Sequence, residues 1–527
     1  MKMHWPPGVP PSVPRPQGSL WDALMASVEA RPRKPAFVLG DEVLFYAELA
    51  RRAEALAGWL QRRAGVARGD RVLLWSQNSL EFVVASYAVL RADAVVVPVN
   101  AMWTAEEARH VVADSGAKAA VVGAEFVPRL AAALAGGLLR DVVVIGNGAV
   151  PDDSRFTPWS AALSADESPA PHLATPDELA VLPYTSGTTG LPKGCMHSHA
   201  TVQSANLAAA GWRAQASDDV FLAVAPLFHA LGMQNGMHLP LMLGATAVLL
   251  PRWNRDAALA LIERHRVTCW AAPPTMLLDF FSNPALVPDA VRSLKLVTGG
   301  SAPMPEALAA TMRERFGIAY QEGYGMTETA SFLFGNPPHR PKLGSLGVPG
   351  PDVDCRIVDP ETHRELPAGE VGEIVVCGPQ VMLGHWCQPQ ATADAFIEIE
   401  GRRHLRTGDL GRVGEDGYYF MTDRLKRMIS VSGYKVWPAE VEAKLNTHPA
   451  VHEACVISTP DPRSGEAVKA LVVPKPGAAL DAPALIAWCR ESMAVYKAPR
   501  VVDFVAELPK SNTGKVLWRE LQERELK

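Results

Sequence analysis

Two kinds of hydrophobic pattern alternate along the first two thirds of the chain. Residues 46–63 and 79–92 place apolar side chains at helical spacing, whereas 71–75 and 94–99 are short apolar runs rich in valine and leucine. Runs of the second kind recur at 119–122, 141–145, 220–223, 246–250, 269–272 and 296–298. Continuous apolar strands between amphipathic helices are typical of parallel sheets covered on both faces. The pattern therefore predicts an α/β fold.

The pattern changes twice towards the C-terminus. After about residue 344, short strands separated by turns predict a small distorted barrel; they lie at 354–358, 372–377, 412–415 and 417–421. From Asp423 onward, three helices and three strands predict a compact α+β domain; they lie at 438–445, 451–458, 468–473, 482–493, 501–504 and 516–523. We therefore expect a large N-terminal domain at 1–422, a connection at 423–426 and a small C-terminal domain at 427–527.

The composition disfavours several classes of protein and kinds of site. Of the 527 residues, 48% are hydrophobic and 20% are charged, as in ordinary globular proteins, and the net charge of −5 disfavours a protein that coats nucleic acid. Seven cysteines without a Cys-x-x-Cys pair disfavour a disulfide framework and a structural zinc site. The proline-rich start lacks the apolar core of a signal peptide, and the apolar run 237–250 is shorter than a membrane span. We therefore expect a cytoplasmic protein without a transmembrane segment.

The strongest local signal is the segment Tyr184-Thr-Ser-Gly-Thr-Thr-Gly-Leu-Pro-Lys-Gly194. Its glycines allow a tight turn with exposed backbone amides, its hydroxyl side chains add hydrogen-bond donors, and Lys193 adds a positive charge. These groups suit a polyphosphate. The segment is not a Walker A loop, because two residues rather than four separate Gly187 from Gly190 and a glycine follows Lys193. A P-loop kinase is therefore disfavoured.

Two further segments carry groups that suit a nucleotide. In Gln321-Glu-Gly-Tyr-Gly-Met-Thr-Glu-Thr329, Tyr324 offers a flat face for a base, Thr327 a hydroxyl for a phosphate and Glu328 a hard oxygen for Mg²⁺. In Arg406-Thr-Gly-Asp-Leu-Gly411, the carboxylate of Asp409 can accept hydrogen bonds from both hydroxyls of a ribose. The structural alternatives are a strand-to-helix turn for the first segment and a hairpin turn for the second.

With these motifs in this order, the chain resembles the adenylate-forming superfamily, which includes acyl- and aryl-CoA synthetases, over nearly its whole length. The resemblance implies that ATP and Mg²⁺ activate a carboxylic acid as an acyl adenylate, which then forms a thioester with coenzyme A. It implies catalytic roles for Lys193, Thr327, Glu328 and Lys515, with Glu328 as the metal ligand. It places the nucleotide against Thr185, Ser186, Gly187, Thr188, Thr189, Gly190, Ser301, Ala302, Glu322, Gly323, Tyr324, Asp409 and Arg424.

The resemblance also implies an acyl pocket, a hinge and a coenzyme A site. Lys426 falls at the position about which the C-terminal domain of the family rotates, and Gly433 and Tyr434 would lie beside the pantetheine arm. His197 and His199 have no partner cluster in the sequence, so we do not expect them to bind a metal. The acyl pocket is expected at His229, Met233, Gly300, Gly325 and Met326.

The identity of the acid depends on what these motifs lack. Gly325 stands where acetate-specific relatives carry a bulky tryptophan, and residues 228–233 lack the aspartate with which other relatives hold an amino group. Ser430 stands where luciferases and plant coumarate ligases carry a lysine, and no arginine occurs in the pocket motifs to bind a dicarboxylate. The segments around Arg424 and Gly433 look most like those of bacterial fatty-acyl-CoA ligases. We therefore expect a medium or long fatty acid.

Several alternatives stay open. The acid could instead be short and branched, hydroxylated, or aromatic. Coenzyme A is the expected acceptor because no carrier domain follows Lys515, but transfer to a separate carrier protein remains an alternative. A non-catalytic nucleotide-binding protein on the same scaffold is the rival class, and turnover would distinguish it. The sequence leaves a homodimer open.

Overall fold

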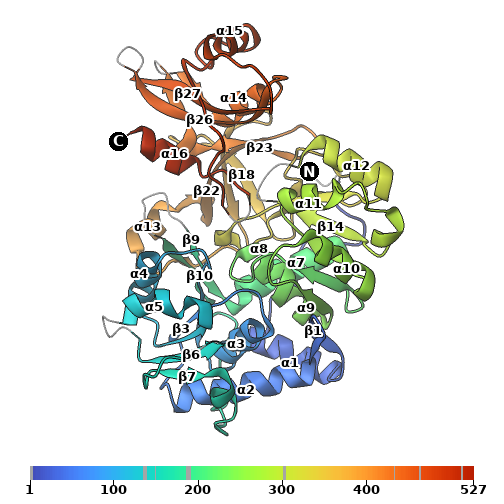
Figure 1. The fold of residues 1–527 in the computed structure, drawn as a ribbon, viewed down its shortest axis with the longest axis vertical. Coiled ribbons are helices and arrows are strands. Elements are labelled where there is room, and N and C mark those ends of the chain that lie inside the picture. Colours follow the sequence, from blue (N-terminus) through green and yellow to red (C-terminus); the bar gives the residue numbers. More distant parts are fainter. Residues whose placement is uncertain are drawn as a thin grey trace. The chain divides into compact units, whose positions relative to one another are not determined.

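The structure of the protein is a computed structural model (Figure 1). It describes residues 4–134, 139–146, 148, 150–185, 192–300, 304–431, 434–461, 465–511 and 514–526. These residues form two compact units: a larger one of residues 2–354 and 377–403, and a smaller one of residues 355–376 and 404–527. Each unit is described separately. The predicted α/β class, with a large domain of parallel sheets and a small C-terminal α+β domain, is confirmed.

The first sheet of the larger unit has a parallel centre and antiparallel edges. Its parallel strands, in order across the sheet, are β15 (Tyr320–Tyr324), β14 (Leu296–Gly299), β13 (Cys269–Ala271), β11 (Val220–Ala223), β12 (Thr246–Leu249) and β1 (Pro35–Leu39). The short antiparallel strands β16 (Phe334–Gly335) and β17 (Val348–Pro349) extend one edge, and β2 (Glu42–Phe45) extends the other. Helices α10 (Arg255–His265), α11 (Pro274–Phe281) and α12 (Glu306–Phe316) share a separate hydrophobic core with this sheet.

The second sheet of the larger unit is also parallel at its centre. Its parallel strands, in order, are β8 (Leu179–Val181), β4 (Val95–Pro98), β3 (Arg71–Trp75), β5 (Ala119–Gly123), β6 (Asp141–Ile145) and β7 (Phe156–Pro158). Strands β10 (Lys193–Ser198) and β20 (Gly384–His385) add an antiparallel edge. The helices that pack around it are α2 (Tyr46–Arg62), α3 (Leu80–Arg91), α4 (Ala105–Ser115), α5 (Val127–Leu134) and α6 (Trp159–Leu163), all drawn in blue to green in Figure 1.

Local sequence explains where several of these helices begin. Ser19 caps α1 (Leu20–Ala30) and Thr104 caps α4; each hydroxyl accepts from the amide three residues on, and the acidic side chain at that position bonds back to the cap. Ser198 likewise caps α7 (His199–Arg213), directly after β10. The start of α7 is therefore fixed by the strand that leaves the predicted phosphate loop.

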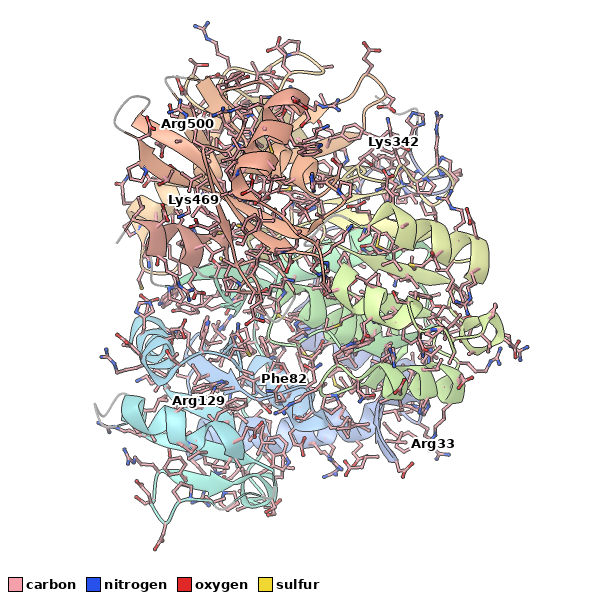
Figure 2. All side chains as sticks on the ribbon, turned by 45° about the horizontal axis from the view of Figure 1, so that its top comes forward. Arg33, Phe82, Arg129, Lys342, Lys469 and Arg500 are labelled. Atoms are coloured by element: carbon pink, nitrogen blue, oxygen red, sulfur yellow. The ribbon has the colours of Figure 1, made fainter. Side chains whose placement is uncertain are left out.

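The smaller unit contains one antiparallel sheet and one mixed sheet, in which β27 and β28 pair in parallel. The first includes β18 (Asp354–Val358), β19 (Gly372–Cys377), β22 (Arg402–Val413) and β23 (Tyr419–Arg424). The second includes β25 (Tyr434–Val436), β24 (Ile429–Val431), β27 (Gly465–Pro474), β26 (Val451–Asp461) and β28 (Val501–Phe504), and its helices are α14 (Pro438–Leu445), α15 (Ala482–Ser492) and α16 (Trp518–Glu525). Lys469, labelled in Figure 2, forms ion pairs with Asp503 at 2.8 Å and Glu525 at 2.6 Å, which join β27 to β28 and α16.

The predicted connection at 423–426 lies inside this smaller unit. It covers the end of β23 and the start of a single helical turn, Leu425–Arg427. The division into two compact units therefore does not coincide with the predicted boundary, which stays a prediction. Among the described residues, no helix is long and apolar enough to cross a membrane.

Candidate active site

A hairpin holds the base of the predicted phosphate loop. Strand β9 (Tyr184–Thr185) pairs with β10, so that Thr185 faces Lys193 and Tyr184 faces Gly194. Burial lowers the pKa of His385, and the positive charge of Lys193 lowers it further. Ser186, Gly187, Thr188, Thr189 and Gly190 lie outside the described residues.

The tight turn after β15 depends on a glycine. A Cβ atom at Gly325 would lie 1.2 Å from the carbonyl oxygen of Ser331, a distance that no side chain can occupy. Ala330 and Ser331 both have positive φ angles, 48° and 87°, which residues other than glycine rarely adopt. The turn brings Thr327 and Glu328 into a single helical turn, Thr327–Thr329, beside the end of β15.

A buried histidine supports this turn from β10. The Nε2 atom of His197 lies 2.7 Å from the carbonyl oxygen of Thr327, and its Nδ1 atom lies 3.2 Å from the hydroxyl of Thr201. Burial lowers the pKa of His197 to about 4, so the ring is neutral near pH 7 and its Nε2–H donates to Thr327. The amide of Met382 donates to the carbonyl oxygen of Glu328. Both predicted phosphate-site residues are thus fixed through their backbone.

An open cavity lies beside the turn. It brings together seven residues that the sequence predicts for the nucleotide or the acid: His229, Gly300, Gly323, Tyr324, Gly325, Met326 and Thr327. Met233 lies elsewhere. It lines a second, smaller cavity with Met237, His238 and Phe82, the last of which is labelled in Figure 2.

The cavity wall also contains polar residues that the sequence motifs did not indicate. They are Arg213, Asn235, Thr298 and Ser331. Arg213 ends α7 and donates from Nη1 to the Oδ1 atom of Asn235 at 2.8 Å. A basic residue in the last turn of a helix is common, so nothing in the sequence distinguished Arg213 from a surface residue. The expectation that the pocket motifs lack an arginine is true of the motifs, but the cavity has one.

Glu322 occupies a different environment from the residues around it. Its side chain is buried, and burial raises the pKa of its carboxyl to about 7. The backbone amides of Gly344 and Met304 donate to it and oppose this rise. It does not belong to the lining of the larger cavity. Ser301 and Ala302 lie outside the described residues.

The smaller unit brings together three other predicted residues. Asp409 on β22 faces Arg424 on β23, and the carboxylate lies 3.0 Å from the guanidinium Nε. Asp409 is only 2% exposed. Burial lowers the pKa of Lys515 to about 8; the charge of Arg424 also lowers it, and that of Asp409 opposes the change. The charges of Arg424 and Asp409 therefore both act on Lys515.

The predicted hinge and coenzyme A residues are Lys426, Gly433 and Tyr434. Lys426 lies within the turn Leu425–Arg427, and Tyr434 begins β25. The structure describes the backbone of both residues. Gly433 lies outside the described residues. The hinge and coenzyme A assignments stay predictions.

The donor set suits a magnesium ion that is held mainly by its nucleotide. Among the described residues, no group of three histidine, cysteine or acidic side chains could enclose a metal. Mg²⁺ does not need such a group, because proteins commonly bind it through one or two carboxylates, water and substrate phosphates. Glu328 is half-buried and adjacent to Thr327, so its carboxylate could serve as the single protein ligand of Mg²⁺.

Comparison with known proteins identifies the family. The model of the AMP-binding enzymes matches residues 24–386, and that of the AMP-binding enzyme C-terminal domain matches residues 440–515. The chain belongs to the AMP-binding enzyme family. The enzyme is 39% identical over 498 residues to a feruloyl-CoA synthase from an Amycolatopsis species, covering 94% of this chain and 96% of that protein.

Two further comparisons agree with this assignment. The enzyme is 34% identical to a long-chain-fatty-acid–CoA ligase of Yersinia pestis, over 94% of this chain and 92% of that protein. Its fold matches ATP-bound MatB from Rhodopseudomonas palustris with a TM-score of 0.87 at 30% identity, over 97% of this chain and 99% of that chain. The enzyme is therefore an AMP-forming acyl-CoA ligase, as the motifs predicted.

Proposed function

We propose that this ligase activates an aromatic carboxylic acid with ATP and transfers the acyl group to coenzyme A. We choose an aromatic acid because of the cavity wall. This wall combines the apolar ring of Phe332 with the polar groups of Arg213 and Asn235. Such a wall suits a ring with oxygen substituents better than the end of an alkyl chain, which would cover the half-buried charge of Arg213 with hydrocarbon. The 39% identity to a feruloyl-CoA synthase supports the same choice.

The first half-reaction follows from the groups around the turn at 325–331. A carboxylate oxygen of the acid attacks the α-phosphorus of ATP, the bond to the bridging oxygen breaks, and pyrophosphate leaves. We assign Tyr324 to the adenine, the hydroxyl of Thr327 to the α-phosphate and Lys193 to the released phosphates. The carboxylate of Asp409, fixed by Arg424, accepts hydrogen bonds from the ribose hydroxyls. Fixed donors and charges of this kind stabilise the negative charge that develops on the phosphoryl oxygens.

Lys515 and Glu328 complete the charge stabilisation in this proposal. Lys515 supplies a positive charge where the carboxylate and the α-phosphate meet. Glu328 would hold Mg²⁺, which when bound adds positive charge to the phosphate oxygens. In the second half-reaction the sulfur of coenzyme A attacks the acyl carbon, and AMP leaves with both bonding electrons. No protein nucleophile is needed in either step.

A panel of acids tests this function. Purified enzyme with ATP, Mg²⁺ and coenzyme A is given benzoate, cinnamate, 4-hydroxycinnamate, hexanoate, dodecanoate and palmitate, and AMP and acyl-CoA are measured. We expect the highest kcat/KM among the aromatic acids. A preference for palmitate or dodecanoate would instead support the fatty-acid expectation and contradict the aromatic assignment. AMP without a thioester would move the acceptor to a carrier protein.

A further inference from the structure

A half-buried cation, Arg213, lines the cavity without a matching anion. The guanidinium carbon of Arg213 lies 5.3 Å from the centre of the Phe332 ring, and Nη1 donates to Asn235 at 2.8 Å. Among the residues that the structure describes, no carboxylate forms an ion pair with Arg213. The ionisable groups that act on its charge are Cys269 and Tyr320, and both are neutral near pH 7 because burial raises the pKa of each.

The position of Arg213 is well defined. Asn235 is held in turn, because its Nδ2 atom donates to the carbonyl oxygen of Leu231 at 3.0 Å, which leaves Oδ1 for the arginine. The ring of Phe332 covers one face of the guanidinium. The Nη2 atom lies near Gly323, where an added Cβ would be 3.9 Å away, at ordinary van der Waals distance. The guanidinium is therefore held by Asn235 and Phe332.

Most hydrogen-bond donors of Arg213 have no acceptor among the described side chains. An arginine side chain has five N–H donors, and the described structure uses one of them for a side-chain acceptor. Burial lowers the pKa of Arg213 to about 10, so the group stays charged at neutral pH. A charged group that is removed from water needs acceptors to replace those hydrogen bonds. An oxygen on the substrate can provide them.

We propose that Arg213, held by Asn235, binds an oxygen substituent of the acyl group at a position away from its reacting carboxylate. The group that Arg213 binds is a hydrogen-bond-accepting oxygen that carries partial or full negative charge. It could be a phenolic oxygen on an aromatic ring or the second carboxylate of a dicarboxylic acid. This inference rests on the proposed acid–CoA ligase function and makes Arg213 a residue that determines specificity.

Matched pairs of acids test the proposal. The pairs are cinnamate with 4-hydroxycinnamate and hexanoate with adipate, which differ only in the distal oxygen group. The variant is Arg213→Met, which keeps the length and apolar stem of the side chain but removes the donors and charge. For at least one pair, the wild-type enzyme should prefer the oxygen-bearing acid by tenfold or more in kcat/KM. The variant should lose about tenfold or more of that preference, as expected for one charge-assisted hydrogen bond, and change little on the acid without the oxygen.

Arg315→Met is the matched control. Arg315 also lies in the last turn of a helix, α12, with its guanidinium 5.0 Å from the ring of Phe316, and it donates to the carbonyl oxygen of Leu286 at 2.6 Å. It does not line the cavity. Its replacement should leave the ratio between paired acids unchanged. Arg213→Lys, which keeps the charge, should retain part of the preference for adipate over hexanoate if the carboxylate is the group bound.

The outcomes separate this inference from the function on which it rests. If Arg213→Met lowers kcat/KM equally for both members of every pair, Arg213 acts on the reacting carboxylate or on folding, and the inference is wrong. If the wild-type enzyme does not discriminate within either pair, it is wrong as well, although the ligase function stands. A wild-type enzyme that converts none of the acids contradicts the proposed function and this inference with it.

Discussion

At the scale of single residues, the charge of Lys515 links the proposed mechanism to pH. Its pKa is lowered to about 8, first by burial and then by the neighbouring charge of Arg424, so it begins to lose its proton only slightly above neutral pH. The proposed role needs the charged form. The adenylation rate should therefore be constant at lower pH and fall as the pH rises through about 8.

Pyrophosphate exchange into ATP measures adenylation without coenzyme A, whose thiol titrates in the same range. Lys515→Arg should remove the decline above pH 8, because arginine stays protonated. Lys515→Ala should lower the exchange rate by about 10²–10³ at pH 7, while thioester formation from supplied acyl adenylate changes little. An equal loss in both half-reactions would contradict the assignment.

At the scale of secondary-structure elements, β10 fixes the turn that carries Thr327. The contact runs from the ring of His197 to the Thr327 carbonyl oxygen at 2.7 Å. His197→Leu removes the donor, so we expect kcat/KM for ATP to fall by about tenfold, the effect of one lost buried hydrogen bond. His197→Gln keeps a donor of similar reach and should restore part of the activity.

The control for this prediction is another buried histidine. His238 lies 3.0 Å from the hydroxyl of Tyr87 and away from the turn. His238→Leu also removes a buried imidazole, so it should lower the melting temperature without a selective effect on ATP. If both variants changed kcat/KM for ATP equally, the contact between β10 and the turn would have no special part in the site.

The turn Leu425–Arg427 is the element in which the predicted hinge lies. Proline at position 426 would restrict its own φ angle and the conformation of Leu425, so rotation there should be hindered. We expect Lys426→Pro to slow thioester formation more than adenylation, as measured by acyl-CoA release and by pyrophosphate exchange. Lys426→Ala leaves the backbone free and is the control. Unchanged thioester formation in the proline variant would contradict the hinge assignment.

At the scale of the whole molecule, three buried histidines predict how stability depends on pH. Burial lowers the pKa of His197 and His199 to about 4 and that of His238 to about 3. The unfolded chain takes up these protons near pH 6.5, so below that pH the unfolded state binds more protons than the folded state. The free energy of unfolding should therefore fall as the pH drops from 6.5 towards 4. Each histidine that stays neutral in the folded state contributes about 1.4 kcal/mol to this fall for every tenfold rise in proton concentration.

Urea unfolding at several pH values between 7.5 and 4 measures this slope. His238→Gln should make the slope shallower by up to one proton, whatever it does to stability at pH 7. His339→Gln, at an exposed position, is the control and should leave the slope unchanged. An identical slope in the wild type and His238→Gln would mean that His238 is not held neutral by burial.

The fold class, the family and most residues of the proposed nucleotide site can be inferred from sequence patterns alone. Apolar strands between amphipathic helices can bury both faces of a sheet only in a layered α/β arrangement, so the fold class follows from the pattern. The turn at 325–331 could also be anticipated, because its chemistry lies in consecutive residues and Gly325 is the one residue type that fits beside Ser331. A motif made of consecutive residues can be recognised without a structure.

The tertiary structure decided which separate segments meet. Arg213 ends a helix and Asn235 lies 22 residues further on, yet they share the cavity with the end of β15. His197 reaches Thr327 across 130 positions, and Met233 faces a different cavity from His229 although only three residues separate them. The order of strands and the direction of each side chain set these contacts. Both arise from packing among distant residues, which the spacing of a motif does not encode.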